Sequence, residues 1–236
     1  MRRYLLTSQM IHNQSIASSL AKLLGKPFSE SRVAYIATSY NGANINLLDD
    51  KTWLVDNINS VHSLGWNKFY MLDIAAMNGL DSSTWMPMID DADVIVMGGG
   101  ANFFLSYWLN ESGLMQKLAK MLKDKVYVGA SAGSMLLMPL LATSSNALDE
   151  FKKGNWDIKL NQLGPESRRS DKTLNLVDFL IRPHYSSSSK YNDELLQKVS
   201  SKFDLPLYAL DDDSAIEVNG SDVSVISEGE WKLFKP

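Results

Sequence analysis

The sequence predicts an α/β fold: a mostly parallel sheet with helices on both faces and an antiparallel hairpin at its carboxyl-terminal end. Short β-rich runs alternate with helix-length segments over the amino-terminal half, as in a parallel sheet with helical crossovers. Several runs are apolar throughout, such as Val94–Met97, which is typical of strands covered on both faces. Near the carboxyl end, Asn219-Gly220 separates two alternating runs, which is a strong hairpin signal.

The individual elements follow in chain order from this alternation. We expect the first strands at Arg3–Thr7, Arg32–Thr38, Lys68–Asp73, Asp93–Met97 and Lys125–Gly129. Helices are expected at Asn13–Leu24, Asp49–Leu64, Asn102–Leu109, Gly113–Lys123 and Ala132–Leu140. In the last third we expect strands at Leu176–Ile181, Leu207–Leu210, Ala215–Val218 and Asp222–Ser227, with one helix at Lys190–Lys202. The polar stretch Asn155–Thr173 is interpreted as an excursion from the sheet, so residues 1–236 are expected to form one domain.

The composition excludes several classes of protein. The 236 residues carry a net charge of −4 without a block of Lys and Arg, so nucleic acid and anionic membrane are not expected partners. The longest apolar run, Met135 to Ala142, is far shorter than the roughly 20 residues of a membrane span. The apolar stretch after Arg3 is too short for a signal peptide, and we expect a cytoplasmic protein. The lack of cysteine excludes disulfides, zinc–thiolate sites and cysteine nucleophiles.

The most informative segment is Gly129-Ala130-Ser131-Ala132-Gly133, a G-x-S-x-G pattern between an expected strand and an expected helix. Such a tight turn lifts a serine hydroxyl out of the sheet, and it needs small residues because its backbone is pressed against neighbouring elements. The hydroxyl then lies near a helix amino terminus, whose N–H groups favour developing negative charge. The alternative is a turn that only allows close helix packing, but the strand–helix context favours a nucleophile.

A second glycine-rich turn, Gly98-Gly99-Gly100, also lies between an expected strand and an expected helix. Three glycines permit backbone conformations closed to other residues and a close approach to a ligand. The loop could present N–H groups to an oxyanion or a phosphate, or connect two elements without a ligand. Phosphate binding is the weaker interpretation, because the Walker pattern is absent and Phe103 replaces the third glycine of G-x-G-x-x-G.

The histidines and a run of acids supply the remaining candidates. His12 and His62 are expected on the surface. His184 follows the expected strand at residues 176–181, and strand carboxyl ends are where α/β sheets place their sites, although a hydrogen-bonded loop histidine is the alternative. The acids Asp211-Asp212-Asp213 follow Leu210 and could bind a metal, cap a turn or orient a histidine; no histidine spacing supports a metal site.

A serine, a histidine and an aspartate thus each fall at a strand end of one expected sheet. A serine hydroxyl needs a neighbouring base to become nucleophilic, and the imidazole needs a carboxylate to hold its tautomer. The chain order Ser…His…Asp differs from the order Ser…Asp…His of α/β-hydrolases, which argues against that superfamily.

In order and spacing, four motifs of the chain resemble those of the S51 serine peptidases, which include aspartyl dipeptidase (peptidase E) and the cyanophycinases. The motifs are Gly98-Gly99-Gly100, Gly129-x-Ser131-Ala132-Gly133, Pro183-His184 and Asp212-Asp213-Ser214. The resemblance runs from the first expected strand to about Val218 and implies a flavodoxin-like sheet. That fold is related to class I glutamine amidotransferases, whose elbow cysteine this chain lacks.

The resemblance implies a serine peptidase that acts on dipeptides or small peptides through an acyl-enzyme, without a cofactor or metal. Ser131 would be the nucleophile and His184 the general base and acid. Asp212 would orient the histidine. The family's acid has also been placed at a position that corresponds to residues 146–149, where this chain has no clean match, and Asp149 is the second candidate. The oxyanion donors would be Gly99 or Gly100, together with Ala132. An amidase or esterase acting on small molecules, and a binding protein without activity, remain the alternatives.

Two positions bear on the substrate. The aspartyl dipeptidases of this family have an asparagine directly after the glycine loop and an arginine in the segment after the catalytic histidine. Here the first position is Ala101, with Asn102 one place later, and the last arginine is Arg182, before the histidine. We therefore expect Asn102 to line the substrate site and dipeptides with amino-terminal aspartate to be poor substrates. A homodimer could use the aromatic-rich segment Phe103–Trp108, which could equally belong to the core.

Overall fold

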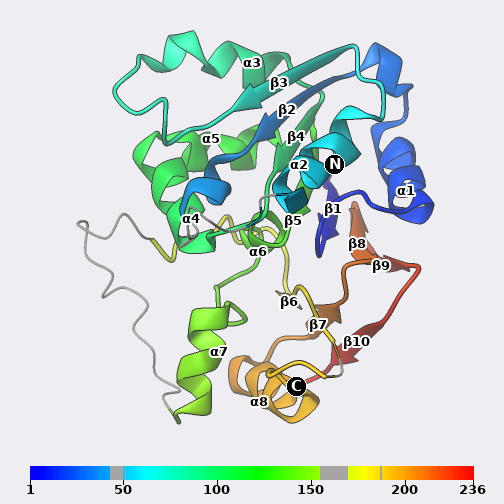
Figure 1. Ribbon diagram of the computed structural model, residues 1–236, viewed down its shortest axis with the longest axis vertical. Helices are drawn as coiled ribbons and strands as arrows, with labels where there is room; N and C mark the ends of the chain where they lie inside the picture. The colour runs from blue at the N-terminus through cyan, green and yellow to red at the C-terminus, as the bar shows by residue number, and fades with distance from the viewer. Residues whose placement is uncertain (43–49, 51, 155–169, 187) are drawn as a thin grey trace.

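A seven-stranded sheet of order β3-β2-β4-β5-β1-β8-β9 forms the centre of the computed structural model (Figure 1), which describes residues 1–42, 50, 52–154, 170–186 and 188–236. Five strands pair in parallel: β1 (Arg3–Thr7), β2 (Arg32–Ile36), β3 (Lys68–Leu72), β4 (Val94–Met97) and β5 (Val126–Ala130). Antiparallel to β1 lies β8 (Ser214–Asn219), which forms a hairpin with the edge strand β9 (Asp222–Ser227). The predicted fold class and its terminal hairpin are confirmed.

Helices cover both faces of this sheet, as the apolar strands require. On one face, α1 (Gln14–Leu24) and α2 (Thr52–His62) pack over the cluster that contains Leu5, Tyr35 and Val128. The other face carries α3 (Met86–Asp91), α4 (Asn102–Glu111), α5 (Leu114–Met121) and α6 (Ala132–Met135). Short 3-10 helices lie at Phe28–Glu30, Thr38–Gly42 and Ser82–Thr84. In α4, Phe103 and Trp108 are buried, so these two rings belong to the core. None of the described helices has the length and apolar character of a membrane span.

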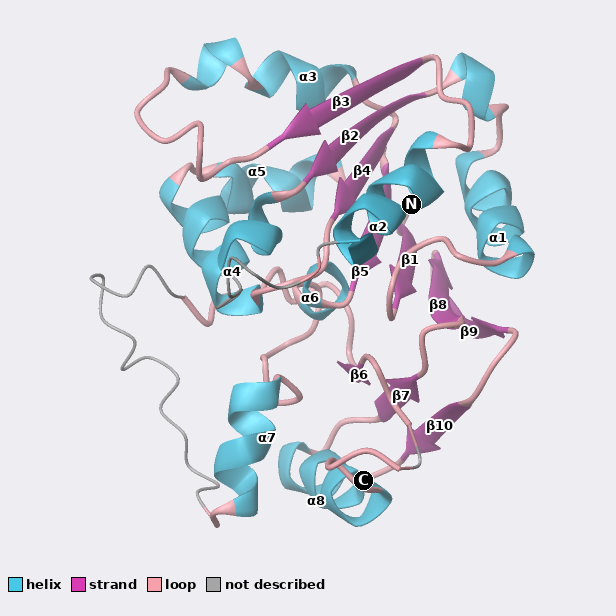
Figure 2. Ribbon diagram, in the orientation of Figure 1, coloured by secondary structure: helices cyan, strands magenta, loops and turns pink. Residues whose placement is uncertain are grey.

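A second, three-stranded sheet lies below the first in Figure 2. Its order is β10-β7-β6, formed by Trp231–Phe234, Leu207–Leu210 and Leu180–Arg182, with β6 parallel to β7 and β10 antiparallel to it. The helices α7 (Ser145–Lys152) and α8 (Asp193–Phe203) belong to this part of the molecule. The expectation that the strands before His184 and Asp211 extend the main sheet is therefore wrong. A tight turn separates β7 from β8, and in it the Ser214 N–H donates to the Asp211 carbonyl (3.2 Å). Only β8, after the turn, joins the main sheet, whereas β7 pairs with β6 and β10.

Several predicted boundaries differ from those observed. The helix expected at residues 132–140 ends at Met135. After it, the N–H groups of Leu137 and Met138 donate to carbonyls three residues earlier instead of four, and Pro139 has no N–H with which to continue the helix. The carbonyl of Leu137 instead accepts from Leu176 and Val177, so the strand expected from residue 176 begins only at Leu180. The elements α3, α7 and β10 were not predicted. Asp49, the expected start of the second helix, and most of the polar stretch at residues 155–173 lie outside the described residues.

Candidate active site

Ser131 lies on the tight turn between β5 and α6 that the G-x-S-x-G pattern predicts. Its backbone has φ 45° and ψ −102°, a conformation that non-glycine residues adopt rarely and at a cost in strain. The flanking glycines are required sterically. A Cβ at Gly129 would lie 2.6 Å from the backbone nitrogen of Ser134, and one at Gly133 would overlap the carbonyl of Met97. The Ser131 N–H donates to the carbonyl of Thr7 (3.0 Å), which fixes the turn to the end of β1.

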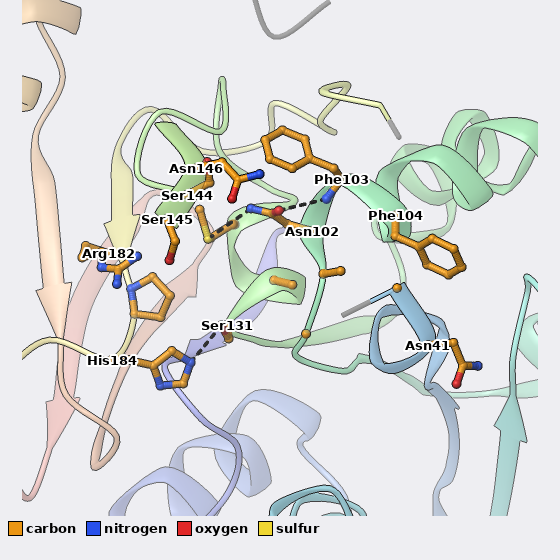
Figure 3. A pocket seen from close by; sticks show the side chains of 16 residues that line it. Asn41, Asn102, Phe103, Phe104, Ser131, Ser144, Ser145, Asn146, Arg182 and His184 are labelled. Carbon is orange, nitrogen blue, oxygen red and sulfur yellow. Dashed lines mark hydrogen bonds between the residues drawn. The ribbon is translucent and has the colours of Figure 1, made fainter. Parts of the chain in front are cut away.

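The hydroxyl of Ser131 is within hydrogen-bond distance of a histidine, and that histidine contacts an aspartate. His184 Nε2 is 3.0 Å from Ser131 Oγ, and His184 Nδ1 is 2.6 Å from Asp212 Oδ1. Figure 3 shows the His184 ring directed at Ser131. The three side chains therefore form the continuous Ser–His–Asp arrangement that serine hydrolases use.

The small sheet and the junction between the two sheets bring His184 and Asp212 together. Arg182 on β6 is paired with Ala209 on β7, so the carboxyl ends of these parallel strands lie at one edge. His184 follows β6 by two residues and has a positive φ of 55°. Asp212 lies in the turn that leads from β7 into β8 of the main sheet. The sequence thus identified the strand ends correctly, although two of them belong to a different sheet.

Ser8, at the end of β1, holds both partners and was not predicted. Its buried hydroxyl donates to Asp212 Oδ1 (2.9 Å) and accepts from the backbone N–H of His184 (2.7 Å). Burial on its own would raise the pKa of Asp212. The hydrogen bonds from His184 and Ser8 and the charges of His184 and His12 outweigh it and lower that pKa below its ordinary value. The carboxylate therefore stays ionised. The only signal for Ser8 in the sequence was its place at a strand end.

The glycine loop after β4 approaches Ser131 from the neighbouring strand. A Cβ at Gly99 would contact the Cβ of Ser131 at 3.4 Å, and one at Gly100, where φ is 123°, would lie 2.5 Å from the Ser39 carbonyl oxygen. The loop is anchored by Ser39, whose hydroxyl donates to the carbonyls of Gly98 (2.8 Å) and Gly99 (2.5 Å). Glycine is thus required at Gly100 by both its backbone angle and the space available.

The two candidate glycines have different surroundings. Burial raises the pKa of Tyr40, and the N–H of Gly99 is among the groups that oppose this rise. Gly100 lines the cavity in front of Ser131, as does Ala132 at the start of α6. Of the three residues considered from the sequence as oxyanion donors, Gly100 and Ala132 thus line the cavity that contains Ser131.

A cavity of about 520 Å³ opens in front of Ser131 (Figure 3). The residues that line it come from five segments: the 3-10 helix after β2, the glycine loop with the start of α4, the elbow with α6, the start of α7, and the end of β6. They are Asn41, Gly42, Gly100, Ala101, Asn102, Phe103, Phe104, Ser131, Ala132, Met135, Ser144, Ser145, Asn146, Arg182, Pro183 and His184. Asn102 lines the cavity as expected. Its Oδ1 accepts from the Phe103 N–H (2.9 Å), and its Nδ2 lies 3.9 Å from the Met135 sulfur.

Other candidates from the sequence lie elsewhere. Asp149, the second candidate for the acid, is on α7 and contacts Lys190 (3.2 Å) and the Tyr191 hydroxyl (3.1 Å), whereas His184 contacts Asp212.

The rest of the acidic run and the other histidines have separate surroundings. Asp211 caps its turn by accepting from the Asp213 N–H (3.1 Å) and the Ser214 hydroxyl (2.5 Å). His12 and His62 are exposed, as predicted.

The chain is similar in sequence and in fold to known peptidases. The sequence model of peptidase family S51 matches residues 5–226. Peptidase E of Streptomyces coelicolor is 28% identical over 155 residues, which are 62% of this chain and 57% of that protein. Peptidase E of a Nostoc species is 28% identical over 156 residues, or 63% and 58% of the two chains. These matches thus span less than two thirds of either relative. The crystal structure of a putative peptidase E from Listeria monocytogenes superposes with a TM-score of 0.68 at 21% identity, covering 97% of this chain and 100% of that one, and shares the fold.

Proposed function

Because the chain belongs to peptidase family S51, we propose that it is a serine peptidase that hydrolyses dipeptides or other small peptides through an acyl-enzyme. The observation that carries this proposal is the continuous contact from Ser131 through His184 to Asp212, at 3.0 and 2.6 Å. The cavity of about 520 Å³ in front of Ser131 has room for a small peptide. We further propose that residues 1–236 form one peptidase domain.

The first half of the reaction forms the acyl-enzyme. Ser131 Oγ attacks the carbonyl carbon of the scissile peptide while His184 Nε2 accepts the hydroxyl proton. Asp212 accepts the hydrogen bond from Nδ1, which holds the correct tautomer and stabilises the imidazolium. The tetrahedral intermediate then breaks its C–N bond, and the imidazolium gives its proton to the leaving amine. In the second half, His184 takes a proton from the water that attacks the ester carbon. The resulting intermediate breaks its C–O bond, the imidazolium returns the proton to Ser131 Oγ, and the carboxylic acid product leaves.

The negative oxygen of the tetrahedral intermediate requires preorganised donors. The backbone N–H groups of Gly100 and Ala132 are assigned this role, since both residues line the cavity together with Ser131. Gly100 belongs to the glycine loop after β4, and Ala132 to the elbow that carries Ser131. Ala132 begins α6, where first-turn N–H groups have no partner within the helix. Ser39 positions the glycine loop through its hydrogen bonds to Gly98 and Gly99.

Hydrolysis of a small set of dipeptides by the wild-type chain and by Ser131→Ala tests this function. We expect the wild type to cleave several dipeptides, and the variant to lose at least about 10³-fold in kcat while keeping its circular dichroism spectrum. Removing one hydroxyl from an already formed turn costs little stability, so a loss of activity without a loss of fold is informative. Dipeptide cleavage by Ser131→Ala at the wild-type rate would contradict the proposal.

The same assay separates the two alternatives. An esterase or amidase for small molecules would cleave a p-nitrophenyl ester but none of the dipeptides. A binding protein without activity would cleave neither. Dipeptide cleavage that depends on Ser131 fits only the peptidase.

A further inference from the structure

Arg182 has an unusual setting for a charged side chain. It is only 8% exposed, yet it lines the cavity that contains Ser131 and His184. Its Nη1 donates to the carbonyl of Thr143 (3.1 Å), and its guanidinium carbon lies 4.4 Å from the centre of the Tyr191 ring. Within the described residues, no carboxylate is close enough to form an ion pair with it.

The nearby acid is already engaged elsewhere. Asp149 supports the charge of Arg182 at longer range, but its carboxylate contacts Lys190 and the Tyr191 hydroxyl. A buried cation without a paired anion is costly to keep, and a guanidinium offers five donors in a planar fork that matches a carboxylate. An arginine buried against a cavity, with one hydrogen bond to a carbonyl, is suited to an anionic group on the ligand.

The position of Arg182 relative to the base indicates which anion this is. Arg182 and His184 are two residues apart at the end of β6, and Figure 3 shows them on the same side of Ser131, with Asn102 and Phe104 on the other. In the proposed reaction His184 protonates the leaving amine, so the leaving amino acid occupies the side of His184. In a dipeptide, a single carbon separates this amine from a free α-carboxylate.

We propose that Arg182 binds the free α-carboxylate of the leaving amino acid and thereby makes the site selective for dipeptides. This inference rests on the proposed peptidase function and adds the class of substrate. Arg182 is the only lysine or arginine among the described residues that line the cavity. Ser145 and Asn146, at the start of α7, line it as well and supply polar surroundings for a carboxylate. A substrate whose carboxyl end is blocked or extended would lose this pairing.

A comparison of Ala-Leu with Ala-Leu-amide tests the inference, because the two substrates differ only in the terminal charge. We expect wild-type kcat/KM to favour the free acid by at least about tenfold, the usual effect of losing a hydrogen-bonded charge. In Arg182→Gln this ratio should fall to near one. The control Lys190→Gln removes a positive charge that pairs with Asp149 outside the cavity lining, and it should keep the wild-type ratio. If Arg182→Gln does not fold, Arg182→Lys serves instead and should lower the ratio, because an ammonium cannot form the paired bonds.

Two results would overturn the inference while leaving the peptidase function in place. One is equal cleavage of acid and amide by a wild-type enzyme that a fluorophosphonate labels at Ser131. The other is an Arg182 variant that keeps the preference for the acid over the amide but loses a preference for Asp-Leu over Asn-Leu, since this would assign Arg182 to a substrate side chain. A wild-type chain that is neither labelled nor active on dipeptides would overturn both proposals.

Discussion

Ser8→Ala should lower kcat because Ser8 holds both partners of the nucleophile. The substitution removes the hydrogen bond from Ser8 Oγ to the Asp212 carboxylate (2.9 Å) and leaves the His184 N–H without its acceptor (2.7 Å). A hydrogen bond to a charged group contributes about 1.5–3 kcal/mol, which corresponds to roughly 10- to 150-fold in rate. The Asp212 side chain is 49% exposed, so water replaces part of the lost bond. We therefore expect a decrease of about 10- to 30-fold in kcat, with little change in KM.

Ser200→Ala is the matched control for this experiment. Ser200, on α8, is also fully buried, and its hydroxyl donates to the carbonyls of Leu205 (2.7 Å) and Phe234 (3.2 Å). Both variants should lose about 1–2 kcal/mol of unfolding free energy in urea denaturation. Only Ser8→Ala should lower kcat for a dipeptide. Wild-type kcat in Ser8→Ala, or a change confined to KM, would refute the positioning role of Ser8.

Three further predictions concern the acid, the oxyanion loop and the substrate. Asp212→Asn should lower kcat by about 10³-fold or more, because the amide favours the wrong imidazole tautomer, whereas Asp149→Asn should have a small effect. A larger loss of kcat in Asp149→Asn than in Asp212→Asn would assign the acid to Asp149. Gly100→Ala should reduce both dipeptide turnover and fluorophosphonate labelling, because its Cβ would lie 2.5 Å from the Ser39 carbonyl oxygen. The control Gly25→Ala also places alanine at a positive φ (73°, against 123° at Gly100), but with no atom within 4 Å of the added carbon, and it should stay active. Equal activity in both variants would contradict the loop's role. Across X-Leu dipeptides, Asp-Leu should not exceed the others by more than about 100-fold in kcat/KM, and a larger lead would show that the aspartate side chain has a donor we have not assigned.

Local patterns in the sequence were sufficient for the strands of the main sheet and for the elbow, but not for the order of the strands. The apolar runs of β4 and β5 reflect burial on both faces of the sheet. The Asn219-Gly220 turn reflects the positive φ that Gly220 adopts (67°). The assignment of β6 and β7 to a separate sheet depends on the turn at Asp211, which no periodicity encodes.

Two residues near Ser131, Ser8 and Arg182, were not found from the sequence, because their contacts are with segments distant in the chain. Ser8 acts through a hydrogen bond to a residue 204 positions away, and its neighbours in the sequence give no indication of this contact. Arg182 was discounted because it precedes His184, but a residue two places before the histidine at the end of β6 still reaches the cavity. Spatial neighbours from distant segments therefore required the structure.

The nucleophilic role of Ser131 is tested most directly by labelling the intact protein with a fluorophosphonate and locating the adduct by mass spectrometry. One adduct should form on Ser131, and labelling should be at least about 100-fold slower in His184→Ala, because the hydroxyl then lacks the base that lies 3.0 Å from it in the wild type. An adduct on another serine, or labelling of Ser131 at the wild-type rate in His184→Ala, would contradict the assignment.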